Sequence, residues 1–172
     1  MLFGFLLAPP GPAHAEDHGH FFFFIAPATA TSATRDVVPR VGVPTHTTLV
    51  HAGGGGEGAL GTRWGAGTDL GGLARARGKD TVASLSVNGF YHPLGQHRGH
   101  VDPYGVFGYG LLLGDSGRQA LGAPHVGSGL TYWLPERRGY EFGLKLEFRS
   151  AFRGGPENLR YREVRIGVGL WR

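Results

Sequence analysis

Residues 140–150, with the sequence YEFGLKLEFRS, alternate between apolar side chains and residues that are mostly charged or glycine. The apolar positions of this segment are Phe142, Leu144, Leu146 and Phe148. The positions between them are Gly143, Lys145, Glu147 and Arg149. Because successive side chains of a β-strand point to opposite faces, this pattern predicts a strand with one apolar and one charged face. Such a strand fits the surface of a soluble β-sandwich or the wall of a barrel in a membrane.

Eight segments with strand-like patterning follow one another along the chain. They span residues 20–28, 47–60, 63–73, 82–92, 103–113, 125–133, 140–150 and 161–171. All but the second are roughly 9 to 11 residues long, which is the length that a tilted strand needs to cross a bilayer. An even number of antiparallel strands places both termini on one side of the membrane, here the periplasmic side. The sequence therefore predicts an all-β fold, an eight-stranded antiparallel up-and-down transmembrane β-barrel.

The charged residues of these segments indicate which face of each strand points inward. A Lys or Arg that faces lipid at mid-depth costs about 2–4 kcal/mol, so the charged face of each strand should line the barrel interior. The residues predicted to meet there are Glu57, Asp69, Lys145, Glu147, Arg149, Glu163 and Arg165. Both signs of charge are present, and we expect them to neutralise one another as a network of buried ion pairs.

The aromatic residues gather near the ends of the predicted strands. If the strands run alternately up and down, one end carries Trp64, Tyr91, Tyr104, Tyr132, Trp133, Tyr140 and Trp171. The other end carries Phe148, Phe152 and Tyr161. Aromatic rings collect at both interfaces of membrane barrels, so the sequence predicts two aromatic belts.

Composition agrees with a small membrane barrel. The chain has 172 residues, enough for one domain, and its 32 glycines and 11 prolines favour short strands over long helices. Only 17% of the residues are charged and no cysteine is present, which excludes disulfides and thiolate metal sites. The net charge of +4 comes from Arg and Lys residues dispersed among strands and turns, so we expect no nucleic-acid partner.

Residues 1–15 have the pattern of a secretion signal. An apolar core, LFGFLLA, precedes Ala13-His14-Ala15, which fits the small-x-small cleavage pattern. Residues 16–172 then form the predicted barrel domain. Its first residues, Glu16-Asp17-His18, would offer a free amine and a histidine for weak adventitious binding of copper(II) or nickel(II).

As an ordered set, several of these segments resemble a known family. They are GGGGEG (53–58), SVNGFYH (86–92), PYGVFGYGLLL (103–113), GLTYW (129–133), LKLEFR (144–149) and VRIGVGL (164–170). From about residue 20 to the C-terminus the chain is similar to small bacterial outer-membrane β-barrels of the outer-membrane protein A and opacity type, often labelled porin-like. The resemblance implies a Gram-negative outer membrane and insertion by the barrel-assembly machinery, which in this family recognises a terminal aromatic residue. Here Trp171 is followed by Arg172.

The chain offers little support for a cofactor, a metal or catalysis. The run GGGGEG matches a dinucleotide fingerprint, but strand-patterned residues follow it where a helix should open. His92, His97, His100 and Asp102 lack regular metal-ligand spacing and are expected to be solvated in a long turn. No G-x-S-x-G or HExxH motif occurs, and His125 and Ser128 have opposite parity on their strand. We therefore expect no enzyme, cofactor or structural metal.

The size of the barrel guides the functional expectation. Eight strands leave an interior just wide enough for side chains to fill, so we expect a structural, monomeric barrel rather than a diffusion pore. Its surface loops would contact lipid, lipopolysaccharide, a host surface or matrix, with loop 29–46 and Arg75, Arg77 and Lys79 most available. The first alternative is a narrow porin-like channel for ions or small solutes. A second is a soluble barrel that binds an apolar ligand, as lipocalins do.

Overall fold

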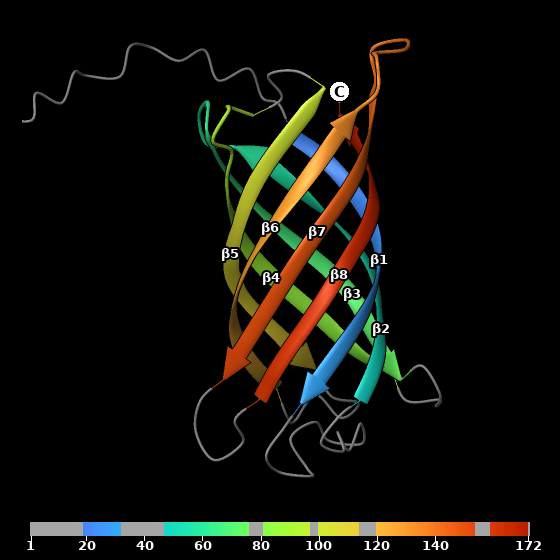
Figure 1. The fold of residues 1–172 in the computed structure, drawn as a ribbon, viewed down its shortest axis with the longest axis vertical. Helices are drawn as coiled ribbons and strands as arrows, with labels where there is room; N and C mark the ends of the chain where they lie inside the picture. The colour runs from blue at the N-terminus through green and yellow to red at the C-terminus, as the bar shows by residue number, and fades with distance from the viewer. Residues whose placement is uncertain are drawn as a thin grey trace, which may run out of the picture.

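The protein folds into a single closed β-barrel (Figure 1). The computed structural model describes residues 19–31, 47–75, 81–96, 100–113, 120–153 and 159–171. The strands are β1 (Gly19–Thr31), β2 (Thr47–Ala59), β3 (Trp64–Arg75), β4 (Thr81–Tyr91), β5 (Val101–Leu113), β6 (Ala120–Trp133), β7 (Glu141–Arg153) and β8 (Leu159–Trp171). Every strand pairs antiparallel with its neighbours in sequence, so the predicted fold class is confirmed. The predicted signal segment, residues 1–15, lies outside the described residues.

Pairing between the first and last strands closes the barrel. β1 pairs with β2 on one side and with β8 on the other, and His20 stands opposite Trp171. The start of β1 and the end of β8 therefore lie at one end of the barrel, here called the termini end. The opposite end is called the far end. No helix in the described part of the chain is long and apolar enough to cross a membrane.

Large apolar side chains cover the outer face of the barrel. The exposed members of this apolar belt are Phe21, Phe23, Ile25, Leu70, Val87, Phe107, Val126, Leu130, Phe142, Leu144, Leu146, Ile166 and Val168. Phe21 and Phe23 are each 68% exposed, and the belt runs over strands from all parts of the chain. A continuous apolar surface of this extent is unstable in water and stable against hydrocarbon. Because side chains alternate between the two faces of each strand, these apolar side chains point outward.

The aromatic residues at the termini end do not all face outward. Trp64, Tyr91, Tyr132 and Tyr140 are exposed on the outer face, whereas Tyr104 and Trp133 are buried inside the barrel. The ring of Trp171 stacks on the buried ring of His20, with 5.6 Å between centroids, and so also faces inward. The seven rings therefore share one end of the barrel but not one face, because a residue's position along the strand sets its depth and not its face.

At the far end, one of the three aromatic rings also faces inward. Phe148 and Phe152 are exposed, but Tyr161 packs against an apolar cluster inside the barrel. That cluster, called the apolar cuff below, consists of Ala28, Ala30, Leu49, Leu73, Val82 and Leu121, with Leu112 packed against it. The interior is thus apolar near the far end and polar at mid-depth.

Candidate functional site

Asp69 is the centre of the charge network at mid-depth. Arg149 Nη1 and Arg165 Nη1 donate to Asp69 Oδ2 over 2.9 and 3.0 Å, and Asn88 Nδ2 donates to the same oxygen over 2.8 Å. Asp69 comes from β3, whereas the arginines come from β7 and β8. The three side chains therefore bridge the lumen from wall to wall, which fixes opposite sides of the barrel to one another.

Glu147 is the second carboxylate of this network. Arg149 Nε donates to Glu147 Oε1, and Tyr104 OH donates to Glu147 Oε2 over 2.9 Å. Lys145 Nζ lies 3.8 Å from Glu147 Oε2. The same ammonium lies 4.2 Å from the ring centroid of Phe22 and 4.6 Å from that of Tyr104, which gives it cation–π partners in place of water.

All seven charged residues that the sequence assigned to the lumen are buried. Their exposed fractions are Glu57 4%, Asp69 1%, Lys145 6%, Glu147 1%, Arg149 2%, Glu163 3% and Arg165 4%. Five of them, called the ion-pair layer below, meet at mid-depth: Asp69, Lys145, Glu147, Arg149 and Arg165. Together with the rings that surround Lys145, this layer bridges the lumen at mid-depth.

His92 belongs to a separate cluster at the termini end. Its Nε2 lies 2.8 Å from Glu57 Oε1 and its Nδ1 lies 2.8 Å from Asp102 Oδ1. Burial lowers the pKa of His92, but the hydrogen bonds to Asp102 and Glu57 outweigh it and raise the pKa to about 9. The imidazolium is therefore charged at neutral pH and cancels part of the charge of the two carboxylates.

This cluster corrects the expectation that the turn histidines are solvated. His92 is only 2% exposed, whereas His100 is exposed and its Nδ1 lies 3.1 Å from the carbonyl oxygen of Trp133. His97 lies outside the described residues. Among the residues that are described, no group of three potential ligands could hold a metal ion.

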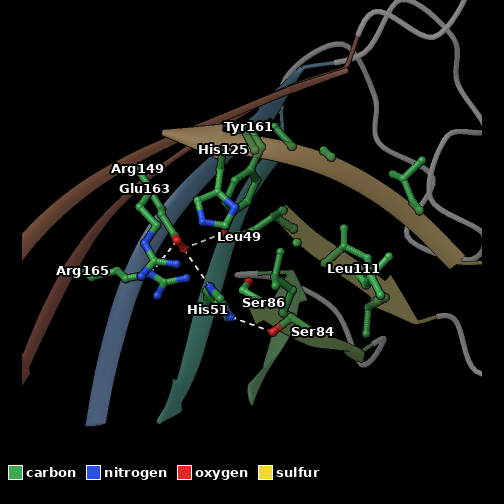
Figure 2. A pocket seen from close by; sticks show the side chains of 18 residues that line it. Leu49, His51, Ser84, Ser86, Leu111, His125, Arg149, Tyr161, Glu163 and Arg165 are labelled. Carbon is green, nitrogen blue, oxygen red and sulfur yellow. Dashed lines mark hydrogen bonds and ion pairs between the residues drawn. The ribbon is translucent and has the colours of Figure 1, made fainter. Parts of the chain in front are cut away.

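The interior contains a cavity of about 90 Å³ between the ion-pair layer and the far end (Figure 2). Leu49, Leu73, Val82, Leu112 and Leu121 form its apolar wall. Polar groups line the rest of it: His51, Ser84, Ser86, His125, Arg149, Glu163 and Arg165. The interior therefore contains an open space between the ion-pair layer and the far end.

A serine, a histidine and a glutamate form a chain of hydrogen bonds on the polar wall of the cavity (Figure 2). Ser84 Oγ lies 2.8 Å from His51 Nε2, and His51 Nδ1 lies 2.7 Å from Glu163 Oε2. The sequence did not reveal these hydrogen bonds, because the one Ser/His pair close together in sequence that was considered there is His125 and Ser128. That pair does face opposite ways, His125 inward and Ser128 outward.

Comparison with known proteins yields solved structures but no sequence relatives. No protein-family model matches the chain, and no curated protein matches its sequence. Three solved barrels are similar to it over most of both chains. Neisserial surface protein A has a TM-score of 0.57 and 13% identity, with 88% of this chain and 95% of that chain covered.

The N-terminal β-barrel domain of Pseudomonas aeruginosa OprF has a TM-score of 0.55 and 17% identity, with coverage of 88% of this chain and 97% of the other. The attachment invasion locus protein Ail of Yersinia pestis has a TM-score of 0.54 and 11% identity, with coverage of 91% and 99%. None of these three is described as an enzyme. At these identities the likeness concerns the fold. The chain has the fold of the small eight-stranded barrels of the bacterial outer membrane, and its apolar belt matches that location.

Proposed function

We propose that the protein is a structural barrel of the outer membrane that does not conduct and that contacts its surroundings through its far end. The observation that carries this proposal is the ion-pair layer, whose charged groups are at most 6% exposed and bond across the lumen. Opening a path through the layer would separate buried opposite charges, and removing one partner of such a pair costs about 3–5 kcal/mol. A resting pore is therefore disfavoured.

Bilayer conductance separates this proposal from its alternative, a narrow channel. The refolded wild-type protein should give no single-channel steps in planar lipid bilayers. Arg149→Ser removes a guanidinium from the middle of the layer and should produce small, irregular currents. Arg162→Ser, on the exposed face of β8, is the matched control and should stay silent. Regular steps from the wild-type protein would favour the channel instead.

Basic residues at the far end support contact with anionic lipid headgroups, including lipopolysaccharide. Arg160 and Arg162 are exposed there, and Arg75 ends β3 at the same level of the barrel. Arg77 and Lys79, which the sequence assigned to the same role, lie outside the described residues. Guanidinium groups bind phosphate through paired hydrogen bonds, which suits this surface. The proposal includes a monomeric barrel inserted by the barrel-assembly machinery.

The headgroup contact can be measured with vesicles that contain or lack lipopolysaccharide. Replacing Arg75, Arg160 and Arg162 together by alanine should weaken binding of the refolded protein to lipopolysaccharide at low salt. Neutral vesicles should show no difference between the two proteins. Unchanged lipopolysaccharide binding by the triple variant would contradict the assignment.

A further inference from the structure

We propose that Ser84, His51 and Glu163 form a nucleophilic acyl-transfer site that hydrolyses short-chain carboxylic esters in the far-end cavity. Ser84 is the nucleophile, His51 the general base, and Glu163 the residue that positions His51. This activity goes beyond the structural role proposed above.

The direction of the hydrogen bonds follows from the chemistry of Glu163. Arg165 Nε donates to Glu163 Oε1 over 2.6 Å, and Tyr161 OH donates to Oε2 over 2.8 Å, so the carboxylate is ionised and acts only as an acceptor. His51 Nδ1 must therefore donate to it, and in the neutral form of the ring the lone pair is then on Nε2. The Ser84 hydroxyl then donates to that lone pair, the arrangement that activates a serine.

Small residues on the intervening strands make this arrangement possible. Gly71 of β3 stands between β2 and β4, and a Cβ there would lie 2.8 Å from His51 Nε2 and 3.1 Å from Ser84 Oγ. On the other side, Ala26 and Ala28 of β1 stand opposite His51 and Glu163. Phe24 packs edge-on against the His51 ring at 4.9 Å between centroids. The fold therefore leaves room for both hydrogen bonds and restrains the imidazole.

The cavity supplies a place for the acyl group and a charge for the transition state. Ser84 borders the same space as the apolar wall formed by Leu49, Val82 and Leu121. At about 90 Å³ the cavity is smaller than the ~150 Å³ apolar cavities that hold benzene, so it selects short acyl chains. Arg149 also lines it, and its buried Nη2 has no hydrogen-bond partner among the described residues. That cation can stabilise a developing oxyanion.

The reaction needs only an ester and water. Ser84 Oγ attacks the carbonyl carbon while its proton passes to His51 Nε2, and the imidazolium then protonates the departing alkoxide as its C–O bond breaks. A water molecule next gives a proton to His51 and attacks the acyl-serine. The carboxylic acid leaves, and the proton returns from His51 to Ser84.

The refolded protein in detergent micelles provides the test. A fluorophosphonate probe should label Ser84 alone, as read from peptide mass spectrometry, and p-nitrophenyl butyrate should be hydrolysed above the micelle background. Ser84→Ala and His51→Gln should each lower hydrolysis by at least 100-fold and abolish labelling. Ser128→Ala, on the outward face of β6 and outside the cavity lining, should keep both. Heat-modifiable gel migration confirms that each variant is folded.

Two further readouts separate catalysis from a structural network. Glu163→Gln should lower kcat with little change in KM and should shift the pH profile of hydrolysis, because Glu163 acts through His51. Wild-type hydrolysis no faster than that of Ser84→Ala, or no label on Ser84, would overturn the proposal. Equal losses in Ser84→Ala and Ser128→Ala would overturn it as well. Neither result bears on conductance, so the structural proposal stands or falls separately.

Discussion

Neutralising Asp69 should destabilise the barrel, because this carboxylate links two arginines of the ion-pair layer. Its carboxylate is 1% exposed and accepts hydrogen bonds from both Arg149 and Arg165. A hydrogen bond to a charged group contributes about 1.5–3 kcal/mol, so Asp69→Asn loses or weakens two such bonds, roughly 3–6 kcal/mol. Arg149 and Arg165 retain Glu147 and Glu163 as partners, which places the expected loss near the lower limit, about 3 kcal/mol.

Urea unfolding of the protein refolded into phospholipid vesicles measures this loss, with tryptophan fluorescence as the signal. With a denaturant dependence of about 2 kcal/mol per molar urea, the midpoint should fall by about 1.5 M. Arg162→Gln removes a charge from the exposed face of β8 and should change stability by less than about 0.5 kcal/mol.

A double-mutant cycle tests whether the loss comes from the bonds themselves. Asp69→Asn combined with Arg149→Met should destabilise less than the sum of the two single changes, by about 0.5–3 kcal/mol. If Asp69→Asn unfolds at the wild-type midpoint, or if the two changes add, the ion-pair layer does not hold the interior together.

Three other predictions concern separate parts of the barrel. His92 has a raised pKa, so its contribution to stability is complete below pH 6.5 and is lost as the pH rises through about 9. The urea midpoint of the wild-type protein should therefore fall over that pH range, and that of His92→Gln should fall much less. Gly55→Val should prevent folding, scored by heat-modifiable migration, because a Cβ there would lie 2.8 Å from the Phe22 ring and would overlap the Thr68 carbonyl oxygen. Ile166→Arg should cost about 2–4 kcal/mol in vesicle unfolding, since Ile166 is 58% exposed on the apolar belt; a cost below 1 kcal/mol would place that position outside the hydrocarbon.

Period-two alternation was enough to predict the eight strands and the face of most of them. Where a strand carries charge on one face, as β7 and β8 do, inward and outward positions follow from the cost of charge in lipid. β1 lacks that signal because four consecutive phenylalanines, residues 21–24, make both faces apolar. Two of those rings, Phe22 and Phe24, face inward, which the sequence alone did not indicate.

Strand boundaries were less predictable at the far end. β6 begins at Ala120, five residues before the predicted start at 125. The prediction started too late because Gly122 and Pro124 are residues typical of a loop, yet both pair with β5. The predicted β7 likewise stops short of its observed end at Arg153. Pairing of β6 with β7 begins only at His125, so Gly122 and Pro124 lie where β6 is paired with β5, and a proline is tolerated at such an edge.

The hydrogen-bonded chain of Ser84, His51 and Glu163 could not be predicted from the sequence. The three residues lie on β4, β2 and β8, and their separations in sequence carry no catalytic spacing. Only the register between strands brings them to one depth. His92 was misjudged for a related reason: its partners Glu57 and Asp102 come from other strands, so its burial depends on tertiary pairing.

The inward rings of β1 have a consequence for assembly. Phe22 and Phe24 stand opposite Gly55 and Gly53 on β2, and opposite Gly169 and Gly167 on β8. If β1 slid by two residues along β8, one ring would meet either Arg165 or Trp171 instead of a glycine. Steric fit between rings and glycines therefore favours a single register for the pairing of β1 with β8, independently of the ionic contacts across the lumen.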